Sequence, residues 1–60
     1  MPPTRSATNA ILEALTDRLE AALELVASGG AETELPRIAS LCRDAAALAE
    51  AGAILVASDA

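Results

Sequence analysis

The chain has 60 residues and a formal net charge of −5, and 53% of its residues are hydrophobic although none is aromatic. Chains of this size bury only about 60% of their unfolded surface, so one domain with a shallow core is the most that this chain can form. With no histidine and a single cysteine, Cys42, an intramolecular disulfide and a Cys/His zinc site are both excluded. We therefore expect self-association to supply the missing stability.

The charge balance predicts which partners the protein avoids. The chain has nine acidic residues but only four arginines and no lysine. This negative charge opposes binding to nucleic acid and to anionic membranes and favours a basic protein partner. The uncharged run Ala51 to Ser58 is too short to span a bilayer, and acidic residues interrupt the segment after Arg5, unlike a secretion signal. We expect a cytoplasmic protein, and the heavy use of alanine and arginine indicates a bacterial gene.

The first element in chain order is a flexible arm at 1–7, which contains Pro2 and Pro3, followed by a helix at about 8–28. Thr4, Ser6 and Thr8 are alternative N-caps for this helix. Its apolar residues repeat at steps of three and four: Leu12, Leu15, Leu19, Ala22 and Val26, flanked by Ile11, Leu23 and Leu25. This spacing predicts an amphipathic helix.

The opposite face of the first helix carries four acids at steps of four, three and four: Glu13, Asp17, Glu20 and Glu24. They are interpreted first as a solvated helix face, second as a docking strip for a basic partner, and last as metal ligands. Carboxylates without histidine bind divalent ions weakly, and two helices cannot enclose the apolar pocket that acid-base catalysis needs. We expect no enzyme activity, no metal and no cofactor.

A glycine turn separates the two predicted helices. Ser28, Gly29 and Gly30 end the first helix, because a glycine after the last turn can adopt the left-handed conformation. The turn is expected at 29–33 and the second helix at about 34–57, with Thr33 or Glu34 as its cap and Pro36 in its first turn.

The second helix carries the widest apolar surface of the sequence. Its heptad line alternates small and large residues and predicts a close antiparallel helix contact: Ile38, Leu41, Ala45, Leu48, Gly52 and Leu55. Two further lines flank it, one of Cys42, Ala49 and Val56 and one of Ala39, Ala46 and Ala53. One partner helix cannot cover all three lines, so the first two are predicted to mediate self-association.

Gly52 leaves two alternatives for the end of the second helix. It can be the C-cap of a helix that ends at Ala51, or a small residue inside a longer helix. Leu55 and Val56 continue both apolar lines past Gly52, which favours the longer helix.

These patterns predict an all-α fold, a two-helix antiparallel hairpin that completes a four-helix bundle by homodimerisation. The predicted function is a non-enzymatic protein-protein interaction module that self-associates and docks a partner through the acidic residues. The alternative is a small chaperone or anti-regulator whose apolar second helix covers an amphipathic helix of a client protein.

Overall fold

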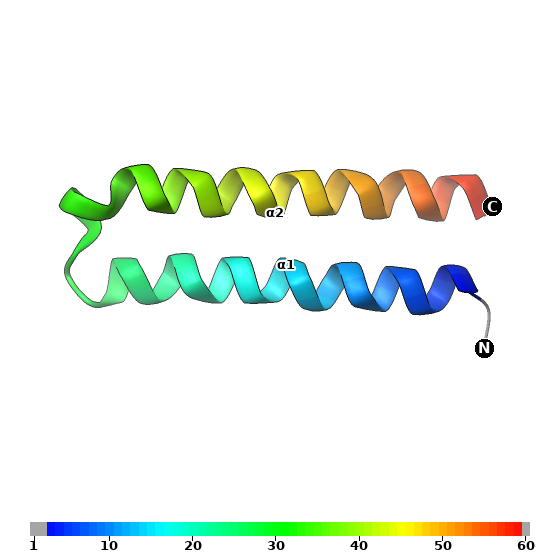
Figure 1. The fold of residues 1–60 in the computed structure, drawn as a ribbon, viewed down its shortest axis with the longest axis horizontal. Helices are drawn as coiled ribbons and strands as arrows, with labels where there is room; N and C mark the ends of the chain where they lie inside the picture. The colour runs from blue at the N-terminus through cyan, green and yellow to red at the C-terminus, as the bar shows by residue number, and fades with distance from the viewer. Residues whose placement is uncertain (1–2, 60) are drawn as a thin grey trace.

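The computed structural model is a pair of antiparallel α-helices joined by a tight turn (Figure 1). It describes the backbone of residues 3–59 and the side chains of residues 5–30 and 32–58. Helix α1 spans Pro3–Ala27 and helix α2 spans Ala31–Asp59. The molecule measures 42 × 17 × 10 Å, so it is a single layer, two helices wide and one helix thick. The predicted all-α hairpin is confirmed.

Helix α1 begins at Pro3, earlier than the expected start near residue 8. Residues 3–7 of the predicted arm are therefore helical, whereas residues 1 and 2 lie outside the described part of the chain. Proline suits a first helical turn, because its φ is already fixed near the helical value and its missing N–H has no partner to lose there. Thr4, Ser6 and Thr8 all lie inside the helix, so none of them is the N-cap.

The turn between the helices ends one helix and starts the next within three residues. Gly29 has a φ of +81°, the left-handed conformation that the sequence predicted for a glycine after α1. The Ser28 amide donates to the Glu24 carbonyl at 2.9 Å and the Gly29 amide donates to the Val26 carbonyl at 3.3 Å. The Ser28 hydroxyl donates to the Leu25 carbonyl at 3.0 Å, so several of the last carbonyls of α1 have donors.

Helix α2 starts at Ala31, three residues before the expected start at 34. The Gly30 carbonyl accepts the Glu34 amide at 2.9 Å, which places Gly30 and not Thr33 or Glu34 at the N-cap. The Thr33 hydroxyl donates to the same carbonyl at 3.1 Å instead of accepting an amide. Pro36 consequently lies in the second turn of α2, where it has no N–H to donate to the carbonyl four residues earlier.

The second helix continues through Gly52 to Asp59, which confirms the longer of the two alternatives for its end. Among the described glycines only Gly29 has a positive φ, so a residue with a side chain could adopt the backbone conformation of Gly52 without strain. The end of α2 lies beside the start of α1, so the molecule has a closed end at the turn and an open end opposite it (Figure 1).

Candidate interaction surface

The two helices meet along a line that we call the seam. On α2 it consists of the residues of the predicted heptad line, Ile38, Leu41, Ala45, Leu48, Gly52 and Leu55, and on α1 of Ile11, Leu15, Arg18, Ala22 and Leu25. Ala45 and Ala22 are buried, with 6% and 8% of their surface exposed, and the other seam residues are half-buried. The structure therefore directs six of the nine residues predicted for self-association toward α1 of the same chain.

Small residues in the seam allow the helices to approach closely. A Cβ atom built on Gly52 would lie 3.5 Å from Ile11 Cγ2, an ordinary van der Waals distance. Among the described residues only the alanines at 22 and 45 fall in the buried class of hydrophobic residues. Because only two alanines are buried, the larger side chains of the seam have few packing neighbours within the hairpin.

The other three predicted self-association residues lie beside the seam and are exposed. Together with exposed residues at the same spacing on both helices they form what we call the apolar face: Leu12, Leu19 and Val26 of α1, and Leu35, Cys42, Ala49 and Val56 of α2. Successive members on one helix are seven residues apart, so each set stays on one side of its helix. About half of the surface of Leu12 (52%) and of Val56 (54%) is exposed.

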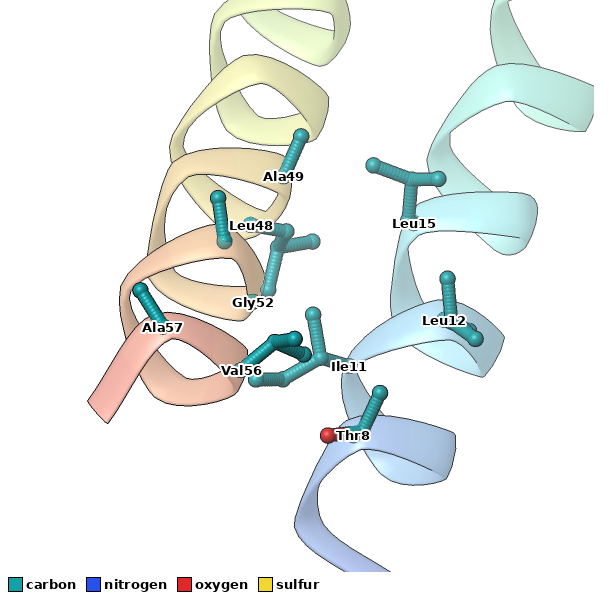
Figure 2. Close-up of a pocket in the computed structure, with 10 residues that line it drawn as sticks. Thr8, Ile11, Leu12, Leu15, Leu48, Ala49, Gly52, Val56 and Ala57 are labelled. Atoms are coloured by element: carbon teal, nitrogen blue, oxygen red, sulfur yellow. The ribbon is translucent and has the colours of Figure 1, made fainter. Parts of the chain in front are cut away.

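Near the open end the apolar face is hollowed into a groove of about 600 Å³ between the helices (Figure 2). Leu12 and Leu15 of α1 line one wall, and Ala49 and Val56 of α2 line the other, as Figure 2 shows. Gly52 leaves the hollow open because it has no side chain to fill it. Among the described residues that line the groove, Thr8 alone is polar. An apolar hollow of this kind on a small protein is typical of an interaction site.

The other broad side of the layer is more polar. The hollow on that side is lined by Glu24, Ser28 and Arg37 together with small or apolar residues of α1. Charged and hydroxyl groups there can remain in water without loss, so this side needs no cover. Among the described residues, five of the exposed large hydrophobic residues thus belong to the apolar face, whereas Leu23 and Ile54 are exposed outside it.

The four acids predicted for partner binding remain exposed along the outside of α1: Glu13, Asp17, Glu20 and Glu24. Leu23 is also exposed there, with 67% of its surface accessible, and it lines a shallow hollow with Asp17, Glu20 and Glu24. Carboxylates around an exposed leucine can receive a basic side chain and an apolar one from the same partner. In the described part of the chain no group of three or more acidic or cysteine side chains is arranged to hold a metal ion.

A search for helices able to cross a membrane returns none among the described residues. Comparison of the chain with family models, with curated proteins and with solved structures finds no match.

The residues predicted for self-association all lie on the second helix, whereas the exposed apolar face also includes residues of α1. The sequence pattern placed Leu12, Leu19 and Val26 in one apolar repeat with Leu15 and Ala22. The structure instead places Ile11, Arg18 and Leu25 in the seam and leaves Leu12, Leu19 and Val26 exposed. The missed signal is the seven-residue repeat of Leu12, Leu19 and Val26, which lies beside the seam rather than on it.

Proposed function

We propose that this protein is a non-enzymatic interaction module that self-associates through its apolar face and docks a basic partner protein through the acids of α1. The observation that supports self-association most strongly is the uncovered apolar face on a hairpin whose buried hydrophobic residues, among those described, are two alanines. Isolated helices of this length are marginally stable in water, and one antiparallel neighbour covers only one stripe of each. A four-helix bundle would cover the second stripe.

The proposed module has no catalytic role, because its groove is lined by apolar side chains and Thr8, and the acids of α1 are exposed to water. Neither supplies a nucleophile beside a base. The free thiol of Cys42 fits a reducing cytoplasmic setting, and the heavy use of alanine and arginine favours a bacterial origin.

Self-association is tested by following helicity and mass against concentration. Circular dichroism and sedimentation equilibrium of the full chain should show a helical dimer that dissociates and loses helix on dilution, because mass action links folding to assembly. A compact monomer whose melting temperature stays constant over a hundredfold dilution would overturn the proposal.

Partner docking is tested with the protein that co-purifies with the chain. Because the acids lie away from the apolar face, the complex should contain the intact dimer, and its affinity should fall steeply above physiological salt, where the Debye length is about 8 Å. Reversal of Asp17 and Glu20 to lysine should abolish binding. Equal affinity in half-molar salt would assign the acids to a solvated face only.

The second candidate function is a chaperone or anti-regulator, and the groove at the open end favours it. The groove is apolar, open to solvent and flanked by helices, as a site for an amphipathic client helix would be. A client seated there would displace the second copy, so stoichiometry separates the two functions. A heterocomplex containing one copy of this chain supports the chaperone, and a complex containing two copies supports the docking module.

A further inference from the structure

We infer that a second copy of this chain covers the apolar face in one particular arrangement: α1 of each copy lies on α2 of the other, and both turns lie at the same end of the bundle. This inference rests on the self-association proposed above. It adds which face is used and how the two copies are oriented.

The size of the apolar face agrees with a hairpin as its occupant. The broad side of the layer measures 42 × 17 Å, or on the order of 700 Å² per copy, close to the ~800 Å² per partner of a standard protein interface. None of the seven residues of the apolar face is charged, so both copies can bury these side chains without leaving an unpaired charge. A single client helix would cover only part of this width.

The heights of the side chains along the face suggest the orientation. Ile11 of α1 lies beside Gly52 of α2, and the antiparallel helices each rise 1.5 Å per residue, so the height of every other pair follows. Each large residue on the α1 side of the face has at least one small residue at its own height on α2. Leu12 lies level with the interval between Ala49 and Ala53, and Leu19 lies level with the interval between Cys42 and Ala46. Val26 lies level with the interval between Leu35 and Ala39.

A two-fold axis parallel to the helices keeps these heights and exchanges the helices. It places α1 of one copy on α2 of the other, so each leucine or valine of α1 meets the small residues at its own level. Leu12 and Leu19 then interdigitate with small residues on both sides of the bundle, and Val26, the smallest of the three, meets Ala39 beside Leu35. The two layers can therefore pack at an even distance.

The competing arrangement has a two-fold axis perpendicular to the helices, with the turns at opposite ends. It would place α1 on α1 and α2 on α2. Leucine or valine would then meet leucine along one side of the bundle. On the other side the small residues Cys42 and Ala49 would meet in the middle, with Leu35 and Val56 toward the ends. Because the distance between packed helices follows the size of the side chains at their contact, the two sides would require different spacings. Two flat layers cannot hold both helix pairs at different spacings, so this arrangement is disfavoured.

The orientation can be measured with a single spin label on the full chain. In a Cys42→Ala background, an Ala27→Cys label marks the exposed last turn of α1 next to the closed end. Pulsed electron resonance should give a distance between the two labels below about 25 Å if the turns share an end, since packed helices lie 8–10 Å apart. Turns at opposite ends would separate the labels by about 35 Å at 1.5 Å per residue, and that result would overturn the orientation. A Ser58→Cys label at the open end should give the same answer.

The face itself is tested with two alanines on one helix. Ala49 lines the groove, whereas Ala51 is equally classed as exposed and does not line it. Ala49→Glu should weaken the dimer by about 100-fold because it buries a charge, and Ala51→Glu should change the dissociation constant less than about threefold. Sedimentation equilibrium measures both, with circular dichroism at high concentration to confirm that each variant folds.

The outcomes of these experiments separate the two levels of the proposal. A parent chain that stays monomeric at millimolar concentration overturns self-association altogether. A dimer that tolerates Ala49→Glu but loses affinity with Ala51→Glu retains self-association and overturns the choice of face. A dimer with the expected response to both glutamates and a long label distance overturns the orientation alone.

Discussion

The seam and the apolar face run side by side along the same two helices, yet one is covered and the other is exposed. On α2 both lines repeat every seven residues and both contain alanine, but the covered line is the one in which Ala45 and Gly52 let the helices approach. The exposed line on α1 has only leucine and valine. Close approach of the backbones at Ala22, Ala45 and Gly52 therefore decides which apolar line lies inside the hairpin, and the line beside it stays exposed.

The seam should be the most sensitive part of the molecule to an increase in size. Ala45→Leu adds a large side chain to a position with 6% exposure, and we expect the free energy of unfolding to fall by about 1–3 kcal/mol. Ala47→Leu, on the same helix but exposed, is the matched control and should change stability by less than about 0.5 kcal/mol. Urea titration at one fixed protein concentration compares the two. A stabilising leucine at 45 would show that the seam is not the contact between the helices.

The glycines at 29 and 52 should respond in opposite directions to the same substitution. Gly29→Ala forces an L residue to adopt a φ of +81° and should destabilise by about 1–2 kcal/mol. Gly52→Ala places a Cβ at an ordinary contact distance, 3.5 Å from Ile11, inside a helix, and should stabilise by about 0.4–1 kcal/mol through a less flexible unfolded chain. Thermal melts of both variants at equal concentration measure the contrast. Destabilisation by Gly52→Ala would mean that the seam is already filled at that position.

The sequence predicted the covered line of α2 better than that of α1, for a physical reason. On α2 the small residues at 45 and 52 mark the line of closest approach, and the structure confirms that this line faces the other helix. On α1 the apolar residues form an arc wider than one seam, and Arg18 lies at its edge. Arg18 is half-buried in the seam, because the long apolar stem of arginine can pack there while its head stays in water.

Pattern alone also left open whether the seam of α2 meets its own chain or another. Both uses bury the same residues, and heptad spacing does not distinguish them. The distinction came from the length of the turn. Gly29 and Gly30 reverse the chain within three residues and place α1 directly beside the seam. What remained uncovered after that reversal defined the apolar face.

The smallest effect on assembly is expected on the outside of α1, away from both the seam and the apolar face. Asp17 and Glu20 are exposed, and reversing both to lysine should change the melting temperature and the dimer dissociation constant little, with a stability change within about 0.5 kcal/mol. A modest gain is the favoured sign, because the chain has a net charge of −5 and the reversal relieves repulsion between two copies. Melting and sedimentation at low and high salt measure it, since a change due to net charge shrinks as salt rises. If the reversal instead dissociates the dimer at both salt concentrations, the acids lie in the contact between copies and cannot be the surface that docks a separate basic partner.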